Sequence, residues 1–214
     1  MNIGDEGYVR PKSNITRAEA ATIFFRLLKD EVRNEALTTE NVFDDVNEGN
    51  WFNTAVSTLA NLGIVNGRTD TTYAPNEPIT RAELTTIVAR MTEAKYEGEA
   101  MFDDISGHWA EGYINLAASI GWVEGDGDGK FRPDDKITRA EVMTLINRVL
   151  DRVPETMEDL HKDMKVWPDN ADTNAWYYIA VQAATHSFEC EKKADGVHIK
   201  ITKIIDNFDW TIYE

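Results

Sequence analysis

Hydrophobic residues recur with helical spacing in three segments of the chain, and each segment begins with the same phrase. Ile-Thr-Arg-Ala-Glu occurs at residues 15–19, 79–83 and 137–141. Apolar residues then follow at intervals of three and four, as in Leu84, Ile87 and Val88, which is typical of a helix that buries one face. The sequence therefore predicts three equivalent amphipathic helices. An arginine also recurs nine residues after the first, at Arg26, Arg90 and Arg148.

A second element also occurs three times and contains a tryptophan. The short runs Phe43-Asp44-Asp45, Phe102-Asp103-Asp104 and Trp167-Pro168-Asp169 precede Trp51, Trp109 and Trp176 respectively. Each tryptophan leads into a second helix-like stretch, which in the first two copies ends at a glycine suited to a left-handed C-cap, Gly63 and Gly121. A proline turn then precedes each Thr-Arg-Ala-Glu helix.

These elements divide the chain into repeats. Residues 42–91 and 101–150 form two full repeats, residues 4–30 hold a second half-repeat, and residues 166–190 hold a first half-repeat. Because half a repeat cannot bury its apolar face alone, we expect 166–190 to pair with 4–30. The prediction is one mainly α-helical domain over residues 1–190, a pseudo-threefold bundle of three two-helix repeats.

The C-terminal part departs from this pattern. Residues 151–165 form a charged connector, and Phe188 to Lys192 and Val197 to Ile201 alternate around Asp195-Gly196. Alternation on both sides of a turn predicts a β-hairpin. The domain is thus followed by a hairpin and tail over residues 191–214, in which Trp210 and Tyr213 are expected to pack against the bundle.

Composition and charge restrict the partners. The 214 residues carry a net charge of −16, which disfavours nucleic acid and anionic membranes as broad-surface partners. No apolar run approaches the ~20 residues needed for membrane insertion. Cys190 is the single cysteine, so no intrachain disulfide is expected. The N-terminal residues lack signal-peptide character, so an exported protein would contain this chain as a mature or excised piece.

Together these motifs resemble the S-layer homology family. The resemblance rests on Phe-Asp-Asp before tryptophan, Gly63-Ile64-Val65-Asn66-Gly67, Phe131-Arg132-Pro133 and the threefold Ile-Thr-Arg-Ala-Glu. It covers residues 4–150 strongly and 166–188 weakly. It implies a pseudo-threefold helical domain that binds secondary cell-wall polymers, often pyruvylated, in grooves between repeats. It also implies an extracellular location in the cell wall or S-layer, as part of a larger surface protein.

The Thr and Glu of the phrase have a structural interpretation. Thr-x-x-Glu is a capping box, in which the hydroxyl accepts from the third helical amide and the carboxylate accepts from the N-cap amide. We therefore assign helix capping to Thr16, Glu19, Thr80, Glu83, Thr138 and Glu141.

The arginine of the phrase has two interpretations. At the first helical position a cation opposes the helix dipole, so its repetition indicates a compensating role. Arg17, Arg81 and Arg139 could bind a carboxylate or phosphate at the helix N-terminus. The alternative is a salt bridge between repeats, from Arg81 or Arg139 to an acidic residue such as Asp44 or Asp103. We expect Arg81 and Arg139, in full repeats, to form better sites than Arg17.

The tryptophans are likewise open to two interpretations. Trp51, Trp109 and Trp176 could be core anchors, or aromatic walls that offer a sugar an apolar face and an N–H donor.

No pattern indicates an enzyme, a cofactor or a metal site. Counting Asp126 as the first position of a calcium loop places Ile137 where a glutamate is needed, and the four histidines lack zinc spacing. The leading hypothesis is a wall anchor that binds a cell-wall polysaccharide. The alternatives are a structural or assembly module of a surface-layer protein with degenerate grooves, and a domain that binds peptidoglycan directly.

Overall fold

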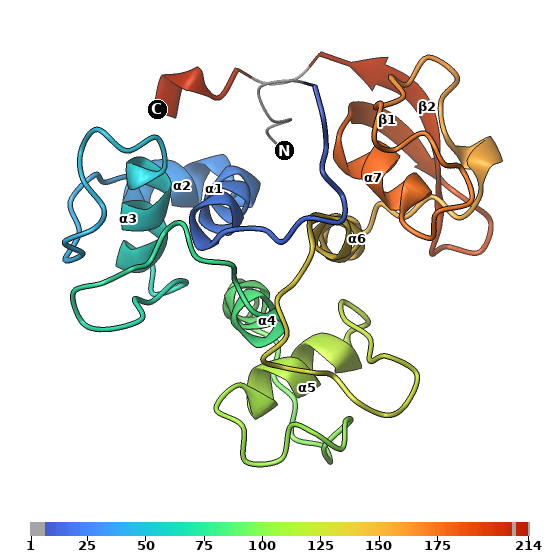
Figure 1. The fold of residues 1–214 in the computed structure, drawn as a ribbon. Coiled ribbons are helices and arrows are strands. Elements are labelled where there is room, and N and C mark those ends of the chain that lie inside the picture. The colour runs from blue at the N-terminus through green and yellow to red at the C-terminus, as the bar shows by residue number, and fades with distance from the viewer. Residues whose placement is uncertain (1–6, 207–208, 214) are drawn as a thin grey trace. The chain divides into compact units, whose positions relative to one another are not determined.

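The computed structural model describes residues 7–206 and 209–213, and most of its regular structure is helical. Residues 4–6 of the predicted second half-repeat, 4–30, lie outside this part. In chain order the elements are α1 (Arg17–Leu27), α2 (Asp30–Ala36), α3 (Asn53–Asn61), α4 (Arg81–Arg90), α5 (Glu111–Ser119), α6 (Arg139–Val149), a 3-10 helix (Met157–Asp159), α7 (Tyr178–Ala184), β1 (Ser187–Lys192), β2 (Ile199–Ile205) and a second 3-10 helix (Thr211–Tyr213) (Figure 1).

The chain forms two compact units, each of which combines distant segments. Unit 1 contains residues 1–13 and 138–209, and unit 2 contains residues 14–137 and 210–214. The N-terminal segment therefore belongs to the same unit as the second half of the chain, and the last residues belong to the same unit as the first half.

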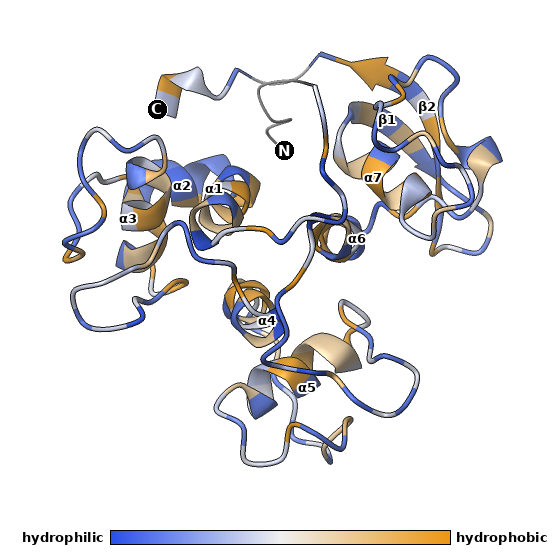
Figure 2. Cartoon of the chain, viewed as in Figure 1, coloured by the Kyte–Doolittle hydropathy of each residue, from blue (hydrophilic) through white to orange (hydrophobic). Residues whose placement is uncertain are grey.

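Unit 2 is built from helix pairs. Helix α1 packs against α3, and α4 packs against α5. The second pair encloses a hydrophobic cluster to which Ala82, Ile114 and Phe131 contribute, all at most 1% exposed. Figure 2 shows hydrophobic and hydrophilic residues mixed along α4 and α5, as expected of helices that bury one face.

The C-terminal tail belongs to unit 2 and packs on its first helices. Trp210 and Tyr213 lie over the guanidinium of the buried Arg33, with ring centroids 5.1 and 5.0 Å from its central carbon. The Phe25 ring meets Tyr213 edge-on at 5.5 Å. This agrees with the expectation that the two aromatic residues of the tail pack against helices.

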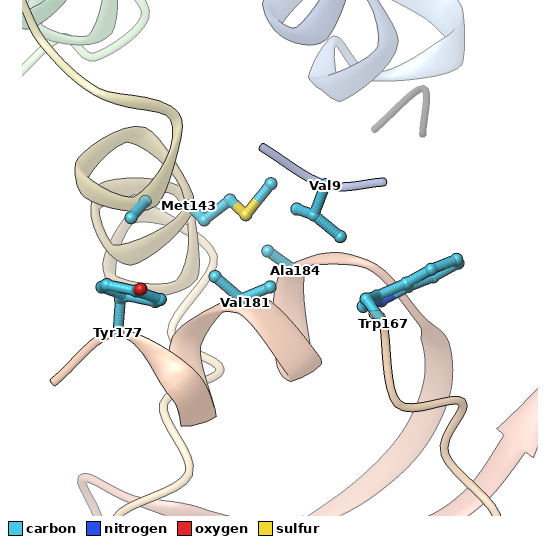
Figure 3. Packing of buried hydrophobic residues seen from close by; sticks show 7 residues of the cluster. Val9, Met143, Trp167, Tyr177, Val181 and Ala184 are labelled. Atoms are coloured by element: carbon cyan, nitrogen blue, oxygen red, sulfur yellow. The ribbon is translucent and has the colours of Figure 1, made fainter. Parts of the chain in front are cut away.

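Unit 1 repeats the same helix pairing once. Helix α6 packs against α7, and Val9 from the N-terminal segment completes their cluster with Met143, Trp167 and Val181 (Figure 3). The predicted β-hairpin is confirmed: β1 and β2 pair antiparallel, with a register irregularity between Glu189 and Cys190. Ile199 and Ile201 of β2 pack on Met164 from the connector.

The predicted pairing of residues 166–190 with residues 4–30 stays a prediction. Within unit 2 helix α1 packs on α3, and within unit 1 helix α7 packs on α6. Each Thr-Arg-Ala-Glu helix therefore packs on the tryptophan helix that follows it in the sequence, because the chain between the two helices folds back. Val9 and Arg10 do bind the third copy, since Asp169 accepts hydrogen bonds from both amides at 3.0 and 2.7 Å. The pseudo-threefold arrangement stays a prediction.

A carboxylate clamp holds the start of each proline turn. Asp45 accepts from the amides of Tyr73 and Ala74 at 2.8 and 2.7 Å, just as Asp169 accepts from Val9 and Arg10. Asp104 does the same for Phe131 and Arg132. The second residue of each pair has a left-handed φ, 54° at Arg10, 61° at Ala74 and 56° at Arg132, which is uncommon outside glycine. The aspartates thus stabilise a strained backbone that sits directly before the proline.

Candidate functional site

The three capping boxes are present as the sequence predicts. At α4 the Glu83 amide donates to Thr80 Oγ1 at 3.1 Å, while the Thr80 amide donates to Glu83 Oε2 at 2.8 Å. The same reciprocal pair forms between Thr16 and Glu19 and between Thr138 and Glu141. These residues fix the helix N-termini on which the arginines stand.

Each arginine of the phrase reaches into a proline turn and donates to its backbone. Arg17 Nε donates to the Tyr73 carbonyl at 2.8 Å, Arg81 Nε to the Phe131 carbonyl at 2.8 Å, and Arg139 Nε to the Val9 carbonyl at 2.7 Å. Arg17 and Arg139 are buried, at 6% and 7% exposure. The cost of a cation at a helix N-terminus is thus offset by hydrogen bonds to carbonyls far along the chain.

Arg17 also forms an ion pair, in which its Nη1 lies 3.2 Å from Glu83 Oε1. Glu83 therefore serves two helices: one oxygen caps α4, and the other accepts from the N-terminus of α1. Arg17 Nη2 donates to the Asn66 carbonyl at 2.7 Å, and its guanidinium lies 4.6 Å from the Tyr73 ring centroid.

A pocket of about 270 Å³ opens beside this arginine, within unit 2. Arg17, Arg68 and Arg90 contribute three positive charges to its lining, against one negative charge from Glu83. The other lining residues come from the turn after α3, from α4 and from the start of the next repeat: Ile64, Val65, Asn66, Gly67, Tyr73, Thr86, Ile87 and Trp109. The pocket is locally cationic in a chain whose net charge is −16.

Two arginines of the pocket were not among the predicted site residues. Arg68 lies with Nη1 2.6 Å from Glu83 and Nε 3.4 Å from Glu77. Arg90 makes long hydrogen bonds, 3.4 and 3.3 Å, to the carbonyls of Gly63 and Ile64, and its guanidinium lies 5.3 Å from the Tyr113 ring centroid. The recurrence of Arg26, Arg90 and Arg148 was a usable signal for Arg90, whereas Arg68 has no counterpart of the same charge in the next repeat.

The tryptophans are not core anchors. Trp51, Trp109 and Trp176 are 49%, 59% and 67% exposed. The residue after each tryptophan is the buried one: Phe52, Ala110 and Tyr177 are at most 8% exposed. Trp109 lines the pocket beside Arg17, so its indole meets the geometric requirement for an aromatic wall.

Gly67 lets the turn that forms the pocket close tightly. A Cβ at this residue would lie 2.7 Å from the Thr72 carbonyl oxygen and 2.7 Å from the Phe43 ring, too close for any side chain. Tyr73, at the end of the same turn, donates its hydroxyl to the Arg17 carbonyl at 3.2 Å. Burial raises the pKa of Tyr73 to about 12, so the hydroxyl stays protonated and keeps this bond at neutral pH.

The hairpin brings one histidine close to two carboxylates. One ligand atom each from Glu155, Asp195 and His198 lies within 4.8 Å of the others. However, Lys193 Nζ lies 2.9 Å from Glu155 and 3.1 Å from Asp159, and His198 Nδ1 lies 2.9 Å from Asp195. This arrangement is an ion-pair network that attaches the connector to the hairpin. Across the described residues, no helix combines the length and apolar character that crossing a bilayer demands.

The helix pairs and the cationic, tryptophan-lined pocket define a helical repeat module with a pocket lined by residues of successive repeats. The sequence profile of the S-layer homology domain matches residues 42–85 and 102–143. The chain belongs to the S-layer homology domain family.

Relatives of the chain include a cell surface protein, an anchoring protein and an enzyme. The chain is 32% identical to cell surface glycoprotein 1 of Acetivibrio thermocellus over 94% of its own length and 9% of that protein. It is 33% identical to the cellulosome-anchoring protein of the same organism over 91% of its own length and 44% of that protein. The amylopullulanase of Thermoanaerobacterium thermosulfurigenes is 34% identical over 65% of this chain and 8% of the enzyme. The chain thus spans less than half of these relatives, and the family points to a non-catalytic module.

Proposed function

We propose that the chain anchors a larger protein to the bacterial cell wall by binding an anionic wall polysaccharide. The observation that carries this proposal is the pocket of unit 2, where three guanidinium groups and the exposed indole of Trp109 surround one space. Guanidinium groups bind carboxylates and phosphates with two parallel hydrogen bonds, and an indole packs on the apolar face of a sugar. An acidic saccharide matches both features.

The residues of the pocket divide into two roles in this proposal. Arg17 is buried and holds the Asn66 and Tyr73 carbonyls, so it shapes the pocket and contributes charge from its floor. Arg68 and Arg90 also line the pocket and are more exposed than Arg17, so they present their guanidinium groups to the ligand. By repeat equivalence we propose corresponding sites at Arg81 and Arg139, with Trp51 and Trp176 as further aromatic walls.

The relatives support an anchoring role over an assembly role. The names cellulosome-anchoring protein and cell surface glycoprotein describe attachment at the cell surface. A carboxylate-bearing polymer, with pyruvate ketals as its acidic groups, is the ligand that we infer from the pocket charge and the family.

Sedimentation with wall sacculi from Acetivibrio thermocellus tests the proposal. We expect the chain to bind intact sacculi and to lose binding after mild acid removes the pyruvate ketals. Trp109→Ala and Arg90→Ala should each weaken binding about 10-fold or more. Ile120→Ala, at a 39% exposed residue outside the pocket lining, is the matched control. Binding that is equal for the parent, Trp109→Ala and Arg90→Ala would overturn the pocket assignment.

A further inference from the structure

Unit 2 contains two turns with the same backbone and different charges. The turn of residues 66–73 lies beside Arg17, and the turn of residues 124–131 lies beside Arg81. Arg17 Nη2 donates to the Asn66 carbonyl, and Arg81 Nη2 donates to the Glu124 carbonyl. The Arg68 amide donates to Thr72 at 2.7 Å, and the Asp126 amide donates to Lys130 at 2.9 Å. These bonds place Arg68 and Asp126 at equivalent positions.

The equivalent side chains have opposite charges, because Arg68 is a cation and Asp126 is an anion. In the first turn Arg68 and Asp70 cancel, so residues 66–73 are neutral overall. In the second turn Glu124, Asp126 and Asp128 outweigh Lys130, so residues 124–131 carry −2. The backbone scaffold is therefore shared, while the electrostatic potential that a ligand meets differs in sign at the equivalent side chain.

Both side chains are charged and held in place. Arg68 is 33% exposed and lines the pocket, with Glu83 2.6 Å away. Asp126 is 20% exposed and lies 2.6 Å from Arg132. The hydrogen bond from the Asp128 amide, with the nearby Arg132, lowers the pKa of Asp126, so this carboxyl stays ionised at neutral pH. An anionic ligand at this turn would meet a fixed negative charge.

We propose that this one position sets the ligand charge that each turn accepts. Arg68 makes the 66–73 turn a site for the acidic substituent of a wall sugar, and Asp126 makes the 124–131 turn select against the same substituent. The two turns are then inequivalent, because the first recognises the acidic substituent and the second disfavours it. The inference rests on the proposed wall-polymer binding and specifies which turn carries the acidic recognition.

Charge-reversal variants test this assignment with the wall polysaccharide purified from Acetivibrio thermocellus sacculi. The indole N–H resonances of the six tryptophans report location, because Trp109 lines the first pocket and Trp122 precedes the second turn. We expect Trp109 in the parent to respond at lower polymer concentration than Trp122. Arg68→Gln and Arg68→Asp should weaken the Trp109 response about 10- to 100-fold. Asp126→Asn and Asp126→Arg should strengthen the Trp122 response.

The controls separate this inference from the proposed function. Lys200→Asp changes the net charge as Arg68→Asp does, at an exposed residue of the hairpin, and should leave both responses unchanged. Arg68→Gln and Asp126→Asn remain informative if a full reversal destabilises its turn, because Asn can still accept from the Asp128 amide. Equal Trp109 responses in the parent and Arg68→Gln, or an unchanged Trp122 response in both Asp126 variants, would overturn the inference. A parent that binds no polymer would instead overturn the proposed function.

Discussion

The substitution Arg17→Ala separates the structural interpretation of the Thr-Arg-Ala-Glu arginine from the ligand interpretation. It removes the hydrogen bonds from Nε to Tyr73 (2.8 Å) and from Nη2 to Asn66 (2.7 Å), and the ion pair with Glu83 (3.2 Å). Hydrogen bonds to charged groups are worth about 1.5–3 kcal/mol each, and removing one partner of a buried ion pair costs about 3–5 kcal/mol. Loss of a cation from the first helical turn returns a few tenths of a kcal/mol.

These terms are not additive, because water entering the pocket can hydrate the exposed carbonyls. We therefore expect Arg17→Ala to lower the free energy of unfolding by about 3 kcal/mol. Urea titration followed by both circular dichroism and tryptophan fluorescence measures this, and coincident curves check that one transition is observed. Arg90→Ala, which loses the 3.3 and 3.4 Å bonds and a guanidinium contact with the Tyr113 ring, should cost about 1 kcal/mol. An Arg17→Ala protein as stable as the Arg90→Ala protein would refute the structural role.

Three further results are expected. Asp104→Asn should lower the free energy of unfolding by about 1 kcal/mol at pH 7. Burial alone would raise the pKa of Asp104, but the Phe131 and Arg132 amides hold this pKa below its ordinary 3.8, so the stability difference should persist above pH ~4 and vanish as the pH falls through the folded-state pKa. A constant difference in urea midpoints down to pH ~2 would contradict the clamp. Thr80→Ala should cost about 1 kcal/mol from the lost cap while polymer binding persists at low temperature, and an unchanged urea midpoint would show that the cap contributes nothing. Because the net charge is −16, the chain repels an anionic polymer at long range, and salt screens this repulsion. The association rate should therefore increase as salt rises from about 0.01 M to 0.15 M, over which the Debye length falls from about 30 to 8 Å. Stopped-flow rates that fall instead would indicate long-range attraction.

The local features of the fold could be predicted because their causes lie within a few residues. Thr80 and Glu83 are three residues apart, and the capping box depends only on that spacing. Gly63 and Gly121 adopt φ values of 68° and 77°, as the C-cap interpretation requires. The hairpin followed from alternation around Asp195-Gly196.

The helix partners and the pocket could not be predicted in the same way. The order of motifs along a repeat does not determine which neighbour covers a helix, so the packing of α1 on α3 depends on tertiary structure. Arg17, which the sequence ranks below Arg81 and Arg139, lies against a complete turn of residues 66–73. Its partners Asn66, Tyr73 and Glu83 are 49 to 66 residues away, so only tertiary structure brings them together.

The burial of the tryptophans was also decided by tertiary packing. At the start of each tryptophan helix, the tryptophan is exposed and the residue directly after it is buried. Because Trp51 and Phe52 are both large and apolar, their hydrophobicity alone does not distinguish them. The structure resolves this by directing Phe52 inward at 5% exposure and leaving Trp51 at 49%.

The proline turns have a consequence for how such chains can change length. The first amides of α1 donate to the carbonyls of Glu77 and Pro75, and those of α4 donate to Asp135 and Pro133, so each helix start is tied to a turn about 60 residues later. An insertion inside either turn would disconnect two repeats at once. Residues 92–100 lie in no regular element and are largely exposed, whereas the corresponding connector 151–165 carries a 3-10 helix that packs on the hairpin. Evolution and protein engineering should therefore add sequence within residues 92–100 rather than within residues 151–165, and an affinity tag or a second domain inserted near residue 96 should leave the rest of unit 2 folded.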